Sequence, residues 1–399
     1  SEYTGPTGSV KGKMRHPERL VPVLYSRCRT GSAKPRGIVE WAEQEAPGCK
    51  PARRNMVDLF AVTTRGLETV SAAELAALPG VTVGTTSYRR VTARAAAPDP
   101  ALLALRTIDD LFVDVATWEA IGPERAALAT LRACSARLDL RPAAATCGIV
   151  RAQSIPHPPA FSVTANFVGR RNYTSDEIKV ACARAIEDRH RGWTYTSDDR
   201  EADLNVRVFV EHATAHVGVR LASEPLQNRP YKQDHVPGSL RPQVAAAMVW
   251  LAGVRPGDRV LDPCCGAGTL LVEAAFRGGH TLGGDPDPTA LLAAYGNTAT
   301  ARARVSLQRW DARALAVADG TVTCVLTNPP WGRKVAIEAD AEAFYAAIGR
   351  EVARVATPDA RIVVLTWVPE WVRAWGLRVV SELEISLYGR TPYVMALVR

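Results

Sequence analysis

Residues 325–335, VLTNPPWGRKV, combine one amide and one large aromatic ring at the end of an apolar run. Pro329 and Pro330 cannot continue a hydrogen-bonded ladder, so a strand must end near Asn328 in a stiff loop. The side-chain oxygen of Asn328 and the backbone carbonyl of Pro329 can each accept an N–H, and Trp331 offers a ring face to a base. We predict that these four residues are catalytic and hold an exocyclic amine of a purine.

A glycine loop precedes this motif in LDPCCGAGTLLVEAA, residues 261–275. Gly266 and Gly268 let the backbone turn sharply and approach a ligand, and the helix that follows begins with free N–H groups. A dinucleotide-binding loop would carry a further glycine where Leu271 stands, which argues against a pyrophosphate ligand. The loop therefore predicts a cofactor without phosphates.

Three aspartates are expected at the ends of successive strands: Asp262, Asp285 and Asp311. Asp262 can meet an ammonium group, Asp285 can accept two ribose hydroxyls, and Asp311 can meet an adenine amino group. One such aspartate alone is more often a cap or a strand end. The ordered set, together with Gly266 and Gly268, predicts that S-adenosyl-L-methionine is the cofactor.

The thiols and imidazoles suggest no other chemistry. Eight cysteines and seven histidines are scattered along the chain, and no CxxC pair occurs. His212 and His216 have helical spacing but lie in a segment that alternates like a hairpin, so we expect no metal site. Adjacent Cys264 and Cys265 suit a tight loop better than a nucleophilic role, because no histidine is near them in sequence.

Length and composition indicate a globular protein of several domains. The chain has 399 residues, of which 47% are hydrophobic and 23% charged. No segment reaches about 18 uninterrupted apolar residues, and the first residues lack the apolar core of a secretion signal, so we expect a cytoplasmic protein without membrane contact. Residues 1–55 hold eleven Lys or Arg and five Glu, a net charge of 11 − 5 = +6. A polyanion partner and a merely solvated tail explain this basic extension equally well.

The hydrophobic patterns divide the rest of the chain. Residues 56–150 predict a small α+β domain. Residues 151–225 predict a second one, with strands that alternate strictly in AFSVTANFVG and a helix capped by Ser175 or Asp176. Residues 226–240 read as a linker. Residues 241–399 alternate strand and helix and end in a possible antiparallel hairpin, which predicts a doubly wound, Rossmann-like α/β domain with a mixed seven-stranded sheet.

The two motifs, DPCCGAGTLLVEAA and TNPPWGRK, resemble those of amino-group methyltransferases, and the segment PYKQDHVPGSLRPQVAAAMVWLAG is similar to the entry segment of THUMP-containing RNA guanine-N2 methyltransferases. The resemblance covers about residues 56–399. It implies that residues 56–150 are an N-terminal ferredoxin-like domain, that residues 151–225 are an RNA-binding THUMP domain, and that the substrate is a guanine N2 amine in tRNA. Trp331 departs from the commoner Tyr or Phe of the family and gives a larger platform.

The partner implied is tRNA or another structured RNA, bound by a monomer. The turn GRRNYTS combines cations and a ring, so we expect Arg170, Arg171 and Tyr173 to contact RNA. Other expected phosphate contacts, near the catalytic residues, are Lys232, Arg241, Arg333 and Lys334.

Four alternatives remain open from the sequence. The Asn-Pro-Pro-aromatic loop recognises an amine rather than a whole base, so guanine-N2 methylation of ribosomal RNA, adenine-N6 methylation and methylation of a protein glutamine amide are all compatible with it. A catalytically silent RNA-binding protein is the alternative outside the enzymes. The modified nucleotide and the number of methyl groups are not encoded in these motifs.

Overall fold

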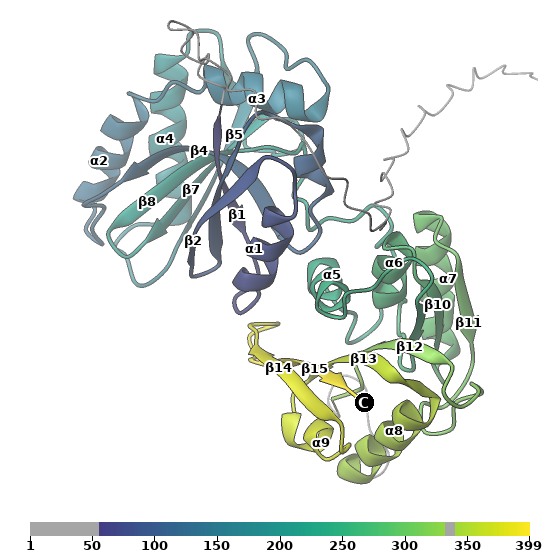
Figure 1. Ribbon diagram of the computed structural model, residues 1–399. Coiled ribbons are helices and arrows are strands. Elements are labelled where there is room, and N and C mark those ends of the chain that lie inside the picture. Colours follow the sequence, from purple (N-terminus) through teal and green to yellow (C-terminus); the bar gives the residue numbers. More distant parts are fainter. Residues whose placement is uncertain (1–55, 332–339) are drawn as a thin grey trace, which may run out of the picture. The chain divides into compact units, whose positions relative to one another are not determined.

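The computed structural model describes residues 56–331 and 340–399, whose helices and strands are drawn in Figure 1. These residues build two β-sheets, one of eight strands and one of seven. Among the helices described, none has the length and apolar character needed to cross a membrane. The basic extension 1–55 lies outside the described residues.

The N-terminal sheet has the strand order β2-β3-β1-β4-β8-β7-β5-β6. Its elements, with the helices between them, are β1 (Val57–Val62), α1 (Glu68–Ala76), β2 (Val81–Ser87), β3 (Arg90–Ala95), η1 (Pro100–Ala104), β4 (Asp110–Trp118), α2 (Ala126–Ser135), α3 (Arg141–Arg151), β5 (Ala160–Phe167), α4 (Ser175–Arg189), β6 (Thr194–Tyr195), β7 (Leu204–Glu211) and β8 (Thr214–Arg220).

The two α+β units expected on either side of residue 150 contribute to this one sheet. The connection is the antiparallel pairing of β4 with β8, in which Phe112 lies opposite Arg220. The backbone groups of β4 and β8 thereby satisfy each other, and two sheets that would each have had an open edge become one. The domain boundary at residue 150 stays a prediction.

The alternating pattern of β5 has the expected consequence. Phe161, Val163 and Ala165 all point into one hydrophobic core, because successive side chains of a strand face opposite sides of the sheet. The expected cap of helix α4 was wrong by one residue. Thr174 is the N-cap, with its hydroxyl accepting from the Glu177 N–H and the Glu177 carboxylate accepting from the Thr174 N–H.

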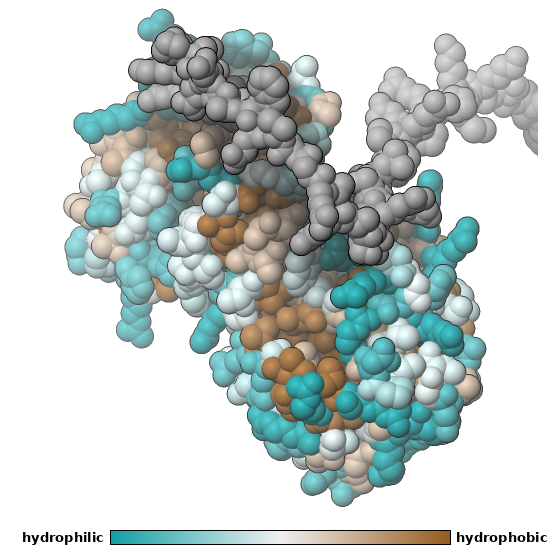
Figure 2. Space-filling view, in the orientation of Figure 1, coloured by the Kyte–Doolittle hydropathy of each residue, from teal (hydrophilic) through white to brown (hydrophobic). Residues whose placement is uncertain are grey.

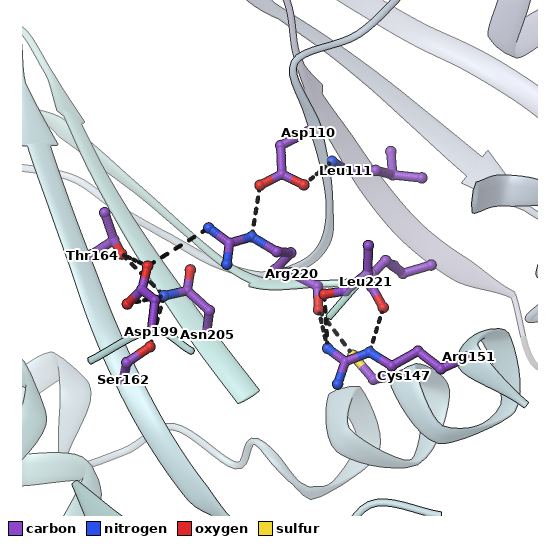
Figure 3. A network of polar contacts seen from close by, with 11 residues as sticks. Asp110, Leu111, Cys147, Arg151, Ser162, Thr164, Asp199, Asn205, Arg220 and Leu221 are labelled. Atoms are coloured by element: carbon purple, nitrogen blue, oxygen red, sulfur yellow. Dashed lines mark hydrogen bonds and ion pairs between the residues drawn. The ribbon is translucent and has the colours of Figure 1, made fainter. Parts of the chain in front are cut away.

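A buried polar network crosses the N-terminal sheet (Figure 3). The Arg220 guanidinium, 4% exposed, donates to Asp110 at 2.7 Å and lies 3.9 Å from Asp199. The Asn205 amide donates to Asp199 at 3.1 Å, and Arg151 donates at 2.9 Å to the backbone carbonyl of Arg220. Each of these buried cations therefore has protein acceptors.

The C-terminal sheet has the strand order β11-β10-β9-β12-β13-β15-β14. Its elements are α5 (Pro242–Leu251), β9 (Arg259–Asp262), α6 (Thr269–Phe276), β10 (His280–Gly284), α7 (Pro288–Ala301), β11 (Val305–Gln308), β12 (Val322–Thr327), α8 (Ala341–Val355), β13 (Ala356–Thr366), α9 (Pro369–Arg373), β14 (Arg378–Glu384) and β15 (Tyr393–Val398).

The predicted mixed sheet of seven strands is confirmed. Strands β11, β10, β9, β12 and β13 pair in parallel, whereas β15 runs antiparallel to both β13 and β14. Leu326 belongs to the core cluster that contains α5, and its neighbour Val325 to the cluster that contains α8. Both faces of β12 are thus buried, which explains why its sequence is a continuous apolar run rather than an alternating one.

The segment expected to be a linker, residues 226–240, is held against the C-terminal part of the chain. Tyr231 is 4% exposed, and its hydroxyl donates to the Glu273 carboxylate at 2.7 Å. The backbone N–H groups of Gln233 and Asp234 donate to the side-chain oxygen of Asn297 at 3.1 and 3.0 Å. The segment is irregular in backbone but fixed by side chains of α6 and α7.

Candidate active site

The glycine loop joins β9 to α6 and has the backbone conformation that its sequence requires. Gly266 and Gly268 have φ values of +50° and +73°, a region that side chains other than glycine rarely adopt. Gly268 is the N-cap of α6 and supplies no side-chain cap, so the first N–H groups of that helix have no side-chain acceptor from the cap. The loop therefore presents backbone donors at the carboxyl end of β9.

Asp262 is the last residue of β9 and is 1% exposed. Its carboxylate accepts the backbone N–H of Cys264 at 3.1 Å. Burial, which outweighs this hydrogen bond, raises the pKa of Asp262 to about 8, and the nearby charge of Asp285 acts in the same direction. A buried carboxylate with a raised pKa fits a site that receives a positively charged ligand group.

Asp285 directly follows β10, and its two carboxylate oxygens accept the backbone N–H groups of Gly266 and Asp287, both at 3.0 Å. Each carboxylate oxygen has a second lone pair, so both can still accept a hydroxyl. Burial raises the pKa of Asp285. The bond to Gly266 also fixes the glycine loop against the end of β10.

Asp311 does not end a strand, as the sequence had suggested, since β11 stops three residues earlier at Gln308. The Asp311 carboxylate accepts from the side chain of Arg313, whose guanidinium lowers the pKa of Asp311. Strand β11 ends level with its partner β10, since Gln308 pairs with Gly284. Trp310, two residues further on, is buried. Its indole donates to the carbonyl of Pro263 at 3.1 Å, which ties this segment to the loop after β9.

Two positioning residues were missed by the sequence reasoning. Trp310 is one, and it packs where a side chain at Gly284 would stand, because a Cβ there would lie 2.5 Å from the indole. Asn297 of α7 is the other. It is fully buried, accepts from two N–H groups of the segment 231–236 and donates to the carbonyls of Asp234 and Ala267 at 2.9 Å. An amide in an otherwise apolar helix face was the signal that could have found it.

Asn328 follows β12, and β12 pairs with β9, so the amide and Asp262 leave adjacent strands at the same edge of the sheet. The side-chain oxygen of Asn328 is buried and accepts no hydrogen bond in the described structure. Trp331 is half-buried against the core cluster of α5, and its indole N–H is likewise buried without an acceptor. The carbonyl of Pro330 accepts from the Tyr345 hydroxyl at 3.3 Å, which steadies the loop from helix α8.

The turn expected to contact RNA is divided between surface and core. Arg170 is exposed. Tyr173 is only 3% exposed and donates to the carbonyl of Gly122, so the expectation of a stackable ring was wrong. The guanidinium of Arg171 donates to Tyr173 and to the carbonyls of Gly122 and of His212, which makes it a tether of the turn.

The other four cations expected to contact phosphates also differ in surroundings. The Lys232 amino group is buried, and burial lowers its pKa to about 8. The expectation that Lys232 contacts phosphate from the surface was therefore wrong. Arg241 is the N-cap residue of α5, and its guanidinium lies 5.1 Å from the ring centre of Tyr388. Arg333 and Lys334 lie outside the described residues.

The two cysteine thiols of the glycine loop are poor nucleophiles. Burial raises the pKa of both Cys264 and Cys265 well above the ordinary range of a thiol, so the reactive thiolate is disfavoured. Within residues 56–331 and 340–399, no group of three or more His, Cys, Asp or Glu side chains is placed to hold a metal ion.

Comparison with known families and structures bears on this site. Residues 229–372 match the family described as RMKL-like, methyltransferase domain. The matched segment contains the glycine loop, the three aspartates and Asn328, and it begins inside the predicted linker. The fold agrees, because the crystal structure of TrmN from Thermus thermophilus superposes with a TM-score of 0.68 over 86% of this chain and 99% of that chain, at 27% identity.

Curated relatives of the methyltransferase domain act on tRNA. A tRNA (guanine(6)-N2)-methyltransferase of Thermus thermophilus is 33% identical over 214 residues, which are 53% of this chain and 63% of that protein. A tRNA (guanine(10)-N2)-dimethyltransferase of Methanothermobacter thermautotrophicus is 40% identical over 113 residues, 27% of this chain and 32% of that protein. The chain thus spans less than two thirds of the length of either relative. These matches confirm the resemblance to guanine-N2 methyltransferases.

Proposed function

We propose that this protein uses S-adenosyl-L-methionine to methylate the exocyclic N2 amine of a guanosine in tRNA. The observation that carries the proposal is the side-chain oxygen of Asn328, a buried acceptor that has no donor among the described residues and lies at the same sheet edge as Asp262. An unpaired buried acceptor costs about 1 to 3 kcal/mol, so its retention calls for a ligand N–H.

The residues around the glycine loop fit the proposed methyl donor. Asp262 would accept its ammonium group, because this carboxylate is buried beside the loop and its pKa is raised to about 8. The remaining lone pairs of Asp285 would accept the ribose hydroxyls, and Asp311 lies on the segment that would face the adenine. Gly266 and Gly268 would let the backbone approach the ligand closely. When bound, the donor supplies an electrophilic methyl group on a sulfonium.

The chain's own part in the transfer is to orient a weak nucleophile. The lone pair of a guanine N2 amine is delocalised into the ring, and acceptors on its two N–H groups favour a pyramidal nitrogen. The Asn328 side chain and the Pro329 carbonyl would be those acceptors, and Pro330 keeps their separation fixed. The amine proton becomes acidic as the nitrogen gains charge, so it can leave to water without a strong general base.

tRNA is the proposed substrate because both curated relatives described above are tRNA guanine-N2 methyltransferases by name. The exposed Arg170 on the turn before α4 supports an RNA-binding role for the N-terminal sheet. Cytoplasmic location and a monomeric state belong to the same proposal.

Methyl transfer to unmodified tRNA tests the proposal. Purified protein would be incubated with tRNA transcripts and a donor labelled on its methyl group, with Asn328→Ala in parallel. We expect the substitution to lower kcat/KM about a hundredfold or more, because it removes an acceptor aimed at the reacting nitrogen. Binding of S-adenosylhomocysteine, measured by calorimetry, should stay unchanged in Asn328→Ala.

The product must also be identified. Mass analysis of digested RNA distinguishes N2-methylguanosine from N6-methyladenosine, and ribosomal RNA offered in competition with tRNA tests the substrate class. Donor binding without label transfer to any RNA would contradict the proposed activity. RNA binding without donor binding would instead support a catalytically silent RNA-binding protein.

A further inference from the structure

The catalytic edge of the C-terminal sheet is the edge at which Asp262 and Asn328 leave their strands. Two segments besides the Asn328 loop also emerge there. Strand β13 lies next to β12, with Val364 opposite Thr327, and it ends at Thr366. Trp367 therefore leaves the sheet on the same side as the catalytic loop. Strand β15 starts at this edge, since Tyr393 pairs with Thr366, so the connection of residues 385–392 also lies there.

These segments carry two pairs of arginine and aromatic side chains. The Arg390 guanidinium carbon lies 5.2 Å from the ring centre of Trp367, and that of Arg241 lies 5.1 Å from the ring centre of Tyr388. Trp367 is 39% exposed and Tyr388 is 45% exposed. The Tyr388 hydroxyl donates to the carbonyl of Ser239 at 2.7 Å, which fixes the ring beside the start of α5. Each ring thus keeps one side toward solvent and has a cation beside it.

The backbone at Tyr388 indicates that this ring has a purpose beyond folding. Tyr388 and Gly389 form a two-residue hairpin turn with φ values of +54° and +73°, closed by mutual backbone hydrogen bonds between Leu387 and Arg390. Such turns strongly favour Asn-Gly, because a tyrosine is strained at positive φ. A bulky ring in a strained position, half exposed beside a catalytic edge, is expected where the side chain binds something.

The surface near this edge carries aromatic and basic side chains, together with acidic ones on β14 that have partners. Figure 2 shows apolar surface gathered over β14 and β15, and the exposed Val379 and Val380 lie toward the other end of β14, where Val379 pairs with Leu397. Of the acidic side chains on β14, Glu382 pairs with Arg373 and Glu384 accepts from Tyr393. Ring faces with guanidinium groups beside them fit unstacked nucleobases and their phosphates, whereas they offer nothing specific to a protein strand.

We propose that Trp367, Arg390, Tyr388 and Arg241 form a stacking surface for the unpaired RNA nucleotides next to the target guanosine. This inference rests on the proposed function, because a base must leave its stack to reach Asn328 and its neighbours then lose their stacking partners. The two rings replace those partners, and the two arginines neutralise the adjoining phosphates.

Two substitutions test the surface by binding of RNA. The probes are an unmodified tRNA transcript and a fluorescein-labelled 12-nucleotide single strand of uridines, titrated by anisotropy. We expect Trp367→Ala and Tyr388→Asn each to weaken binding of both probes by about five- to a hundredfold, the range for one lost stacking contact. Tyr388→Asn should at the same time leave the melting temperature equal or higher, because Asn suits the turn.

The stability readout separates binding from folding. A residue needed only for folding would lose stability together with RNA affinity, whereas Tyr388→Asn is expected to lose affinity alone. Tyr295→Ala, which removes a 55% exposed ring from α7, and Arg350→Ala, which removes an exposed cation from α8, are the matched controls and should bind both RNA probes like the unmodified protein.

The outcomes distinguish this surface from the proposed activity. If Trp367→Ala and Tyr388→Asn both bind RNA normally while methyl transfer proceeds, the surface is excluded and the proposed function stands, and a protein partner for this surface would then be sought. If both variants lose RNA affinity but no tRNA is methylated by the unmodified protein, the surface stands and the proposed function fails. Absence of RNA binding by the unmodified protein overturns the surface.

Discussion

Buried carboxylates in the two sheets differ in whether they have a cationic partner. In the N-terminal sheet, Asp110 is 6% exposed and its carboxylate is held at 2.7 Å by the guanidinium of Arg220. At the edge of the C-terminal sheet, Asp262 is 1% exposed and accepts a backbone N–H but faces no cation among the described residues. Burial raises the pKa of both groups, and that of Asp262 reaches about 8.

Glu273 shows that the second sheet can also pair a buried carboxylate. It lies on α6, is 1% exposed, and accepts from Arg106 at 2.6 Å and from Tyr231 at 2.7 Å. Isolation is therefore a property of Asp262 and its site rather than of the domain. The comparison shows that a buried charge with an oppositely charged partner inside the fold serves the structure. A buried charge without such a partner at a strand end indicates where a ligand supplies one.

The largest expected effect comes from breaking the completed pair. Arg220→Met removes the guanidinium that donates to Asp110 and leaves Arg207 as the remaining nearby cation, which should destabilise the protein by about 3 to 5 kcal/mol in urea unfolding. Arg350→Met, at an exposed position of α8, is the control and should change stability by less than about 0.5 kcal/mol. A small loss in Arg220→Met would mean that water reaches Asp110.

Asp262, which has no cationic partner among the described residues, should make the stability of the protein fall as the pH rises. The folded pKa of Asp262 lies above its unfolded value of roughly 4, so its contribution to stability is full below pH 4 and is lost as the pH rises through about 8. Asp262→Asn removes this loss, and without ligand it should gain up to roughly 1.4 kcal/mol over the unmodified protein per pH unit between pH 5 and 8. Parallel stability curves of the two proteins would contradict the raised pKa.

Binding of a ligand with an ammonium group should ionise the Asp262 carboxyl group and release its proton. At pH 7 most of Asp262 is protonated, and an ammonium group beside it favours the carboxylate, so binding of S-adenosylhomocysteine should release close to one proton. Calorimetry in two buffers of different ionisation enthalpy measures this number. Binding without proton release would place the ammonium away from Asp262.

The smallest expected effects distinguish Arg170 and Arg171, the two arginines of the turn before α4. Arg171→Ala leaves the carbonyls of Ile121 and His212 and the Tyr173 hydroxyl without the Arg171 donor, while the Gly122 carbonyl still accepts from Tyr173, and it should lower stability by about 1 to 3 kcal/mol. Arg170→Ala should leave stability within about 0.5 kcal/mol but weaken tRNA binding and reduce the salt dependence of the affinity. Equal effects of both substitutions on stability would show that exposure does not separate their roles.

Several features of the fold were predictable because their signals are local. The order of strands and helices in the C-terminal sheet follows from hydrophobic periods, and its antiparallel end from the short break between the last two strands. Asp262, Asp285 and Asn328 were predictable as strand-end residues by their positions after apolar runs, whereas Asp311 lies three residues beyond the end of β11, which stops level with its partner β10.

The amino-acid sequence by itself determined the kind of chemistry, since the glycine loop, the aspartates and the Asn-Pro-Pro-Trp loop specify donors, acceptors and stiffness over a few residues each. Only the tertiary structure decided which buried carboxylates have a cationic partner. Pairing of β4 with β8 joins residues about a hundred positions apart, as does the bond from Arg220 to Asp110. Tyr173 is buried and donates to the distant Gly122 carbonyl, whereas Arg170 on the same turn is exposed. Burial and partners depend on such long-range contacts, which local sequence patterns do not encode.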